Sequence, residues 1–148
     1  MTKIVSAARA CVVHENKLLL VSNDGSYWYL PGGHMEPREN LAVCAKREVY
    51  EETGYDIDVQ DIIYVFEFYD KKIDSHKVEC VFRAEINAHP ETHEWEDLGH
   101  DKSVTMKKWF ALDEIKAMDN VQPQLLKDGK WLKHRNNEVY RGYEESKR

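Results

Sequence analysis

The sequence has few cysteines, and this scarcity excludes two architectures that depend on them. Cys11, Cys44 and Cys80 are the only three in 148 residues, an odd number at wide spacing. They form no CxxC pair, so neither a zinc site nor a disulfide framework is indicated. We expect reduced thiols in a cytoplasmic protein, because disulfides are rare in that compartment.

Long hydrophobic runs and an excess of positive charge are also missing. No run approaches the length of about 18 apolar residues that a membrane span requires, and the first residues lack the apolar segment of an export signal. The formal net charge is −6, which argues against sequence-independent binding of nucleic-acid polymers because such binding needs a basic surface. A nucleotide is not excluded, since a bound metal can reverse the local sign of charge.

Repeats, linkers and low-complexity segments are absent as well, so we expect a single domain over residues 1–148. The length and the apolar fraction of 42% are enough for a hydrophobic core. Residues 134–148 are highly charged. This segment is predicted either to extend the last helix or to be mobile.

Most of the chain is predicted as short strands around one long helix. Runs rich in apolar, β-branched and aromatic residues place strands at 4–13, 17–22, 27–30, 62–69, 77–86 and 106–112. The first two strands are expected to form a hairpin. The long helix is predicted between Asn40, a suitable N-cap, and Gly54, a suitable stop. Shorter helices are predicted at 113–118 and 122–133.

The long helix ends in an unusual cluster of three acids, Glu48, Glu51 and Glu52. The carbonyl end of a helix is already partially negative, and like charges three or four positions apart repel each other. At about 100° per residue, Glu48 and Glu52 fall close to the direction of Leu41 and Ala45, which belong to the apolar stripe expected to face inward. This placement requires a compensating interaction.

Two interpretations of the acidic helix end are open. A bound hard cation such as Mg²⁺ would offset the repulsion, or the glutamates could form a solvated face neutralised by Arg47 and Lys46. Arg47 could also form an ion pair that holds a carboxylate in position. Glu39, at the helix entrance, suits the positive end of the helix dipole.

Residues 31–55 resemble the signature of the Nudix hydrolases. That signature is a glycine, five residues, a glutamate, seven residues, Arg-Glu, an aliphatic residue, any residue, Glu-Glu, any residue, a glycine and a final aliphatic residue. The positions in register are Gly33, Glu39, Arg47, Glu48, Val49, Glu51, Glu52 and Gly54. A pattern with this many fixed positions is specific.

The resemblance implies an α+β protein with the Nudix fold, a mixed β-sheet sandwiched between α-helices. It also implies a MutT-like hydrolase that uses Mg²⁺ or Mn²⁺ to cleave the pyrophosphate bond of a nucleoside diphosphate linked to a group X. By position, the metal ligands would be Glu48, Glu51, Glu52 and the carbonyl of Gly32. Glu48 would also be a candidate base. Arg47 would orient Glu48, and Glu39 would support the junction of loop and helix.

The sequence departs from the family pattern in two places and leaves a third position open. Tyr55 replaces the final aliphatic residue, whose place a buried ring could take. Arg38 stands where a glycine is frequent, so it either adds a cation near the phosphates or points to solvent. Many relatives carry a further catalytic carboxylate downstream. The candidates are Glu94, Glu96, Asp97 and Asp101, of which Asp101 is favoured by its distance before Trp109.

The substrate is predicted less sharply than the family. The compact length favours (d)NTP-type substrates, with nucleotide sugars, ADP-ribose and dinucleoside polyphosphates as alternatives. No proline lies between Pro37 and Pro90, which disfavours the ADP-ribose branch, and Tyr69 lies near a position that is often tyrosine in the dinucleoside-polyphosphate branch. A non-catalytic nucleotide sensor on the same fold is disfavoured because the glutamate signature is complete.

Aromatic residues near the signature could serve either substrate or core. Tyr27, Trp28, Tyr29, Tyr64 and Tyr69 could each stack on a base or pack inside the protein, and packing is favoured for each. The resemblance also allows a homodimer, since dimers are frequent in the family.

Overall fold

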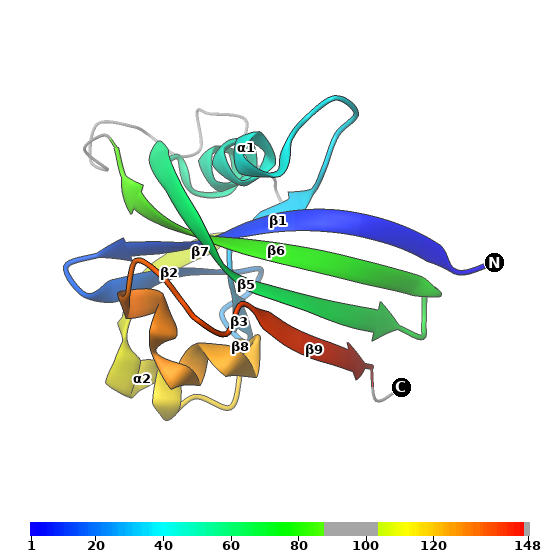
Figure 1. Ribbon diagram of the computed structural model, residues 1–148. Coiled ribbons are helices and arrows are strands. Elements are labelled where there is room, and N and C mark those ends of the chain that lie inside the picture. Colours follow the sequence, from blue (N-terminus) through cyan, green and yellow to red (C-terminus); the bar gives the residue numbers. More distant parts are fainter. Residues whose placement is uncertain (88–103, 147–148) are drawn as a thin grey trace.

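Strand β1 (Lys3–His14) lies at the centre of a mixed sheet and pairs with three other strands. It runs antiparallel to β2 (Lys17–Ser22) and β4 (Gly32–His34), and parallel to β6 (Ser75–Ile86). The structure, a computed structural model, describes residues 1–87 and 104–146 (Figure 1). The hairpin of β1 and β2 confirms the predicted one.

The other elements extend this sheet or cover it. They are β3 (Trp28–Tyr29), α1 (Leu41–Thr53), β5 (Ile57–Asp70), β7 (Met106–Ala111), α2 (Leu112–Lys116), β8 (Val121–Gln122), the 3₁₀ helices η3 (Gln124–Asp128) and η4 (Lys130–Leu132), and β9 (Tyr140–Glu145). Among the described residues the main strand order is β8-β3-β2-β1-β6-β5-β9, while β7 pairs with β2.

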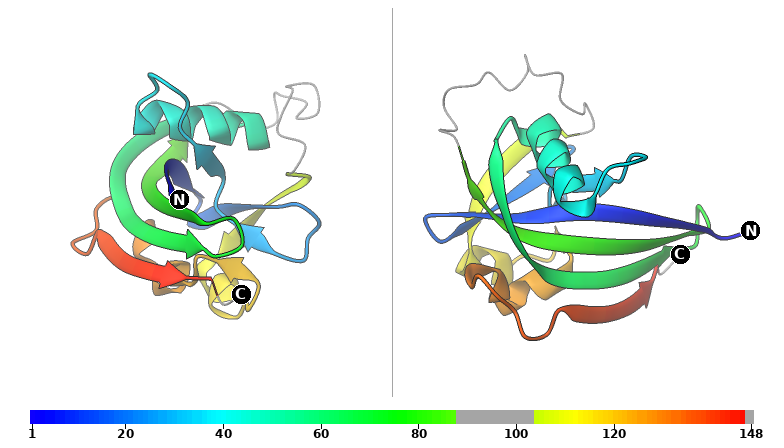
Figure 2. Two further views of the ribbon diagram at one scale, coloured as in Figure 1. Left: turned by 90° about the vertical axis from the view of Figure 1, so that its right-hand side faces the viewer. Right: turned by 45° about the horizontal axis from the view of Figure 1, so that its top comes forward.

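The sheet curls strongly, with helices on both sides. Figure 2 shows the curl of the long strands, with α1 on one side and α2 on the other. This arrangement confirms the expected α+β fold in which helices flank a mixed sheet. Within residues 1–87 and 104–146, no helix combines the length and apolar composition needed to cross a bilayer.

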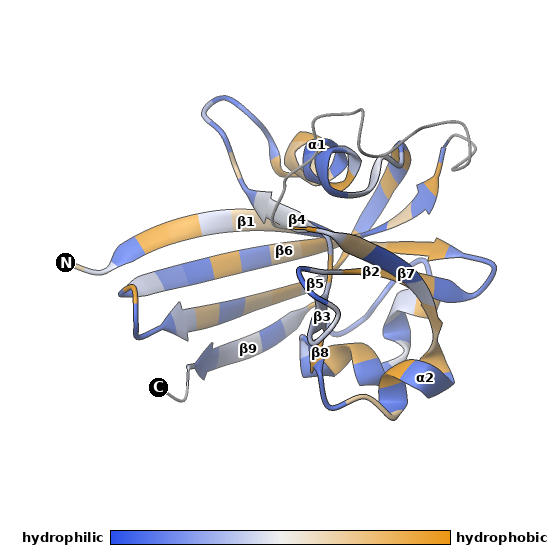
Figure 3. Cartoon of the chain, turned by 180° about the vertical axis from the view of Figure 1, so that it is seen from behind, coloured by the Kyte–Doolittle hydropathy of each residue, from blue (hydrophilic) through white to orange (hydrophobic). Residues whose placement is uncertain are grey.

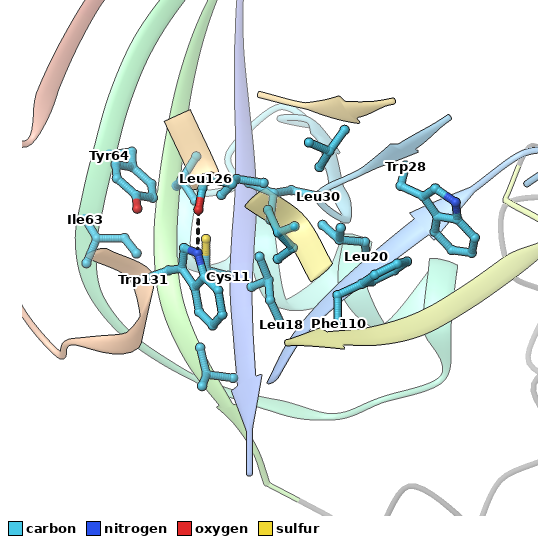
Figure 4. Close-up of a cluster of buried hydrophobic side chains, with 14 residues drawn as sticks. Cys11, Leu18, Leu20, Trp28, Leu30, Ile63, Tyr64, Phe110, Leu126 and Trp131 are labelled. Carbon is cyan, nitrogen blue, oxygen red and sulfur yellow. Dashed lines mark hydrogen bonds between the residues drawn. The ribbon is translucent and has the colours of Figure 1, made fainter. Parts of the chain in front are cut away.

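The main core lies between the sheet and the helices around α2. Its buried members include Leu18 and Leu20 of β2, Phe110 of β7 and Trp131 of η4 (Figure 4). Strand β2 is buried along most of its length, which explains its continuous apolar run. The indole Nε1 of Trp131 donates a hydrogen bond to the carbonyl of Leu126 at 2.8 Å, so its polar group is satisfied inside the core.

Helix α1 begins and ends where its caps place it. The side-chain oxygen of Asn40 accepts a hydrogen bond from the backbone N–H of Val43 at 2.8 Å. Gly54 has φ 79°, in the left-handed region that commonly ends helices at glycine. Ala45 and Val49 are fully buried against the sheet, while other positions around the helix are hydrophilic (Figure 3). The predicted helix is confirmed.

Two strands are longer than the sequence pattern suggested. Strand β5 begins at Ile57 rather than at residue 62, and β6 begins at Ser75 rather than at residue 77. The first part of β5 contains polar residues and register shifts near Ile62, which interrupt the apolar pattern. Pairing with β6 keeps this part extended despite its composition.

The prediction of one helix over 122–133 is wrong in type. The segment forms a short strand, β8, followed by two 3₁₀ helices. Gly129 separates them with φ 73°, and an added Cβ would lie 2.7 Å from a methyl carbon of Leu112. The close contact with α2 therefore requires a glycine at this position. The left-handed conformation of Gly129 interrupts what the sequence pattern predicted as a continuous helix.

The described residues 134–146 also differ from the prediction for 134–148. Tyr140–Glu145 forms β9, which pairs parallel with β5 at one edge of the sheet (Figure 1). The backbone N–H of Val65 donates to the carbonyl of Val139 at 2.7 Å, and that of Ser146 donates to Tyr69 at 2.8 Å. The edge of β5 offers unpaired backbone N–H and C=O groups, and these hold the segment in an extended conformation. The segment is therefore neither helical nor mobile.

Candidate active site

Two glycines let the loop before α1 approach both the central strand and the helix. Gly32 has φ 151°, and an added Cβ would lie 2.4 Å from the carbonyl oxygen of Ala8. An added Cβ at Gly33 would lie 2.6 Å from the carboxyl carbon of Glu48. Larger residues would collide at both positions. The loop backbone is therefore in close contact with the carboxylate of Glu48.

The three glutamates at the end of α1 differ in exposure. Glu52 is 2% exposed, and the side chain of Glu48 is 13% exposed. The side chain of Glu51 is 41% exposed. Glu48 and Glu52 thus face inward as predicted from the helical periodicity. The alternative of a solvated face neutralised by Arg47 and Lys46 is wrong for Glu48 and Glu52, whereas Glu51 is exposed and pairs with Arg47.

Arg47 connects the entrance of the helix to its end. Its Nε and Nη2 donate to the two carboxylate oxygens of Glu39 at 2.6 and 2.9 Å, a bidentate pair. Its Nη1 donates to Glu48 at 2.9 Å and to Glu51 at 3.2 Å. The hydrogen bonds from Arg47 lower the pKa of Glu39 to about 2. The predicted ion pair of Arg47 is present, and its hydrogen bonds join three carboxylates, with Glu36 as a fourth, more distant ion-pair partner at 3.8 Å.

Glu52 has the opposite electrostatic character. Burial raises the pKa of its carboxyl to about 9; the charge of Arg9 opposes this rise, and the adjacent Glu48 carboxylate adds to it. The backbone N–H of Gly32 donates to Glu52 at 3.3 Å. A buried carboxylate beside another acid gains from either a proton or a cation.

The donors around this end of α1 fit a divalent ion in kind. Carboxylates and backbone carbonyls are ligands that Mg²⁺ accepts, and Mn²⁺ shares this preference. Glu48 lies within hydrogen-bonding reach of Glu52, and the Gly32 backbone touches the same group. As they stand, no three His, Cys, Asp or Glu side chains in the described part of the chain converge on one ion position. Arg47 contacts one carboxylate oxygen of Glu48 and one of Glu51.

Arg9 is a residue of this region that the sequence reasoning missed. Its Nε forms an ion pair with Glu79 at 2.5 Å, and its Nη1 donates to the carbonyl of Leu30 at 2.9 Å. An added Cβ at Gly32 would lie 2.5 Å from its Cγ. The available signal was a single charged residue inside the apolar run of the first strand.

Lys107 is a second missed residue, and it caps α1 from another strand. Its Nζ donates to the carbonyl of Thr53 at 2.6 Å and lies 4.2 Å from the ring centroid of Tyr55. The last turn of α1 contains no basic residue of its own. Lys107 therefore supplies the positive charge that a helix C-terminus favours. Sequence spacing gave no signal, because the two residues are 54 positions apart.

Of the two departures from the signature, Tyr55 has a structural explanation and Arg38 has none. Tyr55 is 8% exposed and stacks on Trp109 with ring centroids 5.8 Å apart, so its ring takes the expected aliphatic place. Arg38 is exposed and has φ 68°, in the region that favours glycine. The predicted downstream carboxylates, Glu94, Glu96, Asp97 and Asp101, lie outside the described residues.

The aromatic candidates divide between core and surface. Trp28 and Tyr64 are buried in the main core, and Tyr69 donates to Asp74 at 2.7 Å, so these three have structural roles. Tyr27 and Tyr29 instead line a cavity of about 210 Å³ that also contacts Arg9. The favoured packing interpretation is therefore confirmed for Trp28 and Tyr64 and does not describe Tyr27, which is 43% exposed.

Comparison with known proteins shows the family to which this chain belongs. Residues 4–129 match the profile of the NUDIX domain. The chain belongs to the Nudix family. Phosphatase NudJ of Escherichia coli (strain K12) is 31% identical over 123 residues, which cover 79% of this chain and 75% of that protein. This Nudix hydrolase is accordingly a pyrophosphohydrolase that acts on phosphorus-containing anhydrides.

Solved structures share the Nudix fold. A NUDIX hydrolase from Nitrosomonas europaea aligns with a TM-score of 0.70 at 23% identity, covering 86% of each chain. An ADP-ribose pyrophosphatase from Streptococcus suis aligns with a TM-score of 0.59 at 18% identity, covering 95% of this chain and 98% of that one. At these identities the likeness shows the fold. Nudix hydrolases act on nucleotide conjugates and generally use divalent metal ions.

Proposed function

We propose that this Nudix hydrolase cleaves the pyrophosphate bond of a nucleoside diphosphate linked to X, with Mg²⁺ or Mn²⁺ held at the end of α1. The proposed ligands are Glu48, Glu51, Glu52 and the carbonyl of Gly32. The observation that carries the proposal is the buried Glu52 carboxyl beside Glu48, at a helix end where two acids repel each other.

Different residues of the site would have different roles in hydrolysis. A bound divalent ion neutralises charge on the phosphate oxygens and lowers the pKa of its water. Arg47 holds Glu48 against the Gly33 loop, and Glu39 fixes Arg47 in turn. Glu48 is the proposed base, and general-base catalysis typically contributes about 10²- to 10⁴-fold in rate. Asp101 is the proposed assisting carboxylate of the downstream segment.

A (d)NTP, in which X is the terminal phosphate, is the preferred substrate. The compact chain and the absence of a proline between Pro37 and Pro90 support it over ADP-ribose. Nucleotide sugars, ADP-ribose and dinucleoside polyphosphates are the alternatives. The relatives are described as a phosphatase and as an ADP-ribose pyrophosphatase, so the branch is decided by the products that this chain releases.

The test combines a substrate panel with direct metal binding. Wild type, Glu52→Gln and Glu15→Gln are assayed with each substrate class and Mg²⁺ or Mn²⁺, and products are identified by chromatography. The Glu15 side chain is 83% exposed in a turn far along the chain from α1, so it is a control for the same chemical change. Mn²⁺ binding is followed by electron paramagnetic resonance without substrate.

We expect Glu52→Gln to lose most turnover and to bind Mn²⁺ more weakly, while Glu15→Gln behaves as wild type. Wild-type turnover and Mn²⁺ affinity in Glu52→Gln would refute the ligand assignment. Release of a nucleoside monophosphate and pyrophosphate would identify a (d)NTP-type substrate. Preferential release of AMP and ribose 5-phosphate from ADP-ribose would contradict the preferred class and leave the hydrolase assignment in place.

A further inference from the structure

The loop before α1 is fastened to β1 close to Gly32, whose carbonyl is a proposed metal ligand. The backbone N–H of Ala10 donates to the carbonyl of Pro31 at 3.1 Å, and Nη1 of Arg9 donates to the carbonyl of Leu30 at 2.9 Å. Hydrogen-bonded pairs alternate with open pairs along an antiparallel ladder, so the next pair, Arg9 and Gly32, is an open one. The backbone N–H of Gly32 therefore points away from β1.

The backbone of Gly32 lies between the side chain of Arg9 and the buried carboxyl of Glu52. The N–H of Gly32 donates to Glu52 at 3.3 Å. On its other side, an added Cβ at Gly32 would lie 2.5 Å from Cγ of Arg9. A displacement of the loop would therefore move Gly32 relative to Glu52, and both residues belong to the proposed cation site.

The side chain of Arg9 is itself fixed by a carboxylate from another strand. Its Nε pairs with Glu79 of β6 at 2.5 Å. The Arg9 side chain is 21% exposed and that of Glu79 is 11% exposed, so this contact is largely shielded from water. The guanidinium uses one arm for Glu79 and another for Leu30. It therefore reaches the loop from a fixed position on the sheet.

The positive charge of Arg9 cannot by itself favour a cation at this place. That charge acts on Glu52, and like charges repel, so a guanidinium beside the proposed site disfavours a second cation there. Any gain that Arg9 gives to metal binding must come from the contacts it makes with the loop. Charge and contact thus predict opposite effects when the residue is replaced.

We propose that Arg9 is a positioning residue for the cation site, which holds the loop at Leu30 so that the carbonyl of Gly32 is available to the divalent ion. The pair with Glu79 keeps the guanidinium in place. Groups that orient metal ligands without touching the ion typically contribute about 10- to 100-fold in metal affinity or activity. This proposal rests on the proposed function, because the ligand that Arg9 positions is assigned there.

Arg83 offers a matched control on β6. Its Nη1 pairs with Glu85 at 2.8 Å, and its Nε donates to the carbonyl of Trp131 at 3.2 Å. Both arginines thus bind one carboxylate and one backbone carbonyl. Arg83 is 5% exposed, and the carbonyl that it holds belongs to η4 instead of the loop. A general loss of packing would therefore affect an Arg83 variant at least as strongly as an Arg9 variant.

The test measures metal binding without turnover. Mn²⁺ is titrated into wild type, Arg9→Lys, Arg9→Gln and Arg83→Lys, and bound ion is followed by electron paramagnetic resonance without substrate. Lysine keeps the charge, but its single terminal nitrogen cannot reproduce the two-armed contact with Glu79 and Leu30. Glutamine removes the charge. Urea denaturation of the same preparations reports whether each variant is folded.

We expect both Arg9 variants to bind Mn²⁺ about 10- to 100-fold more weakly than wild type. Arg83→Lys should bind Mn²⁺ as wild type does, even though it loses stability. If only the charge of Arg9 mattered, Arg9→Lys would match wild type and Arg9→Gln would bind Mn²⁺ more tightly. The two Arg9 variants are independent, so either one that folds decides between contact and charge.

A second readout follows the Gly32 carbonyl itself. Protein labelled with ¹³C at the glycine carbonyls is loaded with Mn²⁺ and examined by electron–nuclear double resonance. The strong coupling of a directly bound carbonyl should appear in wild type and in Arg83→Lys and should be reduced in Arg9→Lys. A merely structural role of Arg9 would leave this coupling unchanged in folded protein that has bound the ion.

Four results would overturn the positioning role of Arg9. They are wild-type Mn²⁺ affinity in Arg9→Lys, tighter binding in Arg9→Gln, an equal loss of affinity in Arg83→Lys, and no ¹³C coupling in wild type. Failure of the proposed function has a different signature, because wild type would then neither bind Mn²⁺ nor hydrolyse any substrate of the panel. The positioning role fails alone when wild type does both and the Arg9 variants match it.

Discussion

The two ends of helix α1 carry glutamates in opposite electrostatic states. Glu39, at the entrance, accepts hydrogen bonds from Nε and Nη2 of Arg47, and these lower its pKa to about 2. Glu52, at the exit, is more deeply buried beside Glu48, and its pKa rises to about 9. The same residue type is thus an anchored anion at one end and a group in need of a positive charge at the other.

This difference arises because the hydrogen bonds of one arginine are divided unequally among several glutamates. Arg47 gives two hydrogen bonds to Glu39 and one each to Glu48 and Glu51. Glu52 receives a backbone hydrogen bond from Gly32. Arg47 therefore stabilises the framework of the site, and the buried carboxyl of Glu52 at the end of the helix belongs to the proposed cation site.

The strongest test of the comparison removes Arg47. Arg47→Ala leaves Glu39, whose side chain is 8% exposed, without its bidentate partner. Breaking a buried ion pair by deleting one partner costs about 3–5 kcal/mol of stability. We expect the free energy of unfolding to fall by about 3 kcal/mol, because Arg47 is partly exposed. The measurement is the free energy of unfolding from urea denaturation of the metal-free protein.

A double-mutant cycle with Glu39→Gln separates the pair from other effects of Arg47. If the pair carries the energy, Arg47→Ala should cost much less in the Glu39→Gln background than in wild type. Additive losses in the double variant would show that Glu39 is not the main partner. Arg47→Lys should recover only part of the stability, since lysine lacks the planar fork.

The helix and its loop were predictable because their determinants are local. Asn40, Gly54 and the signature glutamates act within a few turns of chain, so periodicity and capping placed the helix and the inward direction of Glu48 and Glu52. The partners of these groups could not be found this way. Lys107 and Arg9 reach the same region from separate strands, and only the folded sheet brings them together.

The segment after Val121 was predicted wrongly because its structure depends on distant contacts. A helical pattern was predicted there, but the packing of Gly129 against Leu112 breaks it into 3₁₀ turns. The charged residues that follow were assigned to a helix extension or a mobile end, and they pair with the edge of β5 instead. Strand pairing depends on an available edge, which composition does not reveal.

The second prediction concerns pH and the entrance of the helix. The folded pKa of Glu39, about 2, is lower than its usual value near 4.5, so its ionised form stabilises the fold above pH 4.5 and this stability is lost as pH falls toward 2. The full pKa shift would correspond to about 3.4 kcal/mol at about 1.4 kcal/mol per pKa unit, and screening of this ion pair by solvent reduces the expected loss to about 2 kcal/mol. Denaturant unfolding of wild type and Glu39→Gln between pH 6 and 2.5 measures it, and equal pH slopes would contradict the assignment.

The third prediction addresses the exit of the helix. In metal-free protein at pH 8, Glu52→Gln should raise the free energy of unfolding by about 1–2 kcal/mol. The raised pKa of Glu52, about 9, means that its carboxyl must take up a proton on folding at this pH, and glutamine avoids that cost. The same substitution should abolish most of the stabilisation that Mg²⁺ gives to wild type. Thermal unfolding with chelator and with Mg²⁺ reports both effects. A destabilised metal-free variant would mean that Glu52 has a compensating partner.

The smallest expected effect tests whether Lys107 stabilises the C-terminal end of α1. Lys107→Ala removes the hydrogen bond to the Thr53 carbonyl and the charge near the helix end, a loss of about 1 kcal/mol. The adjacent Lys108 is exposed and lies over the Phe110 ring at 5.2 Å, so Lys108→Ala is the matched control. Amide hydrogen exchange in the last turn of α1 should accelerate in Lys107→Ala alone. Equal protection in both variants would show that Lys107 does not stabilise the helix end, and the contrast between the ends would then be sharper still.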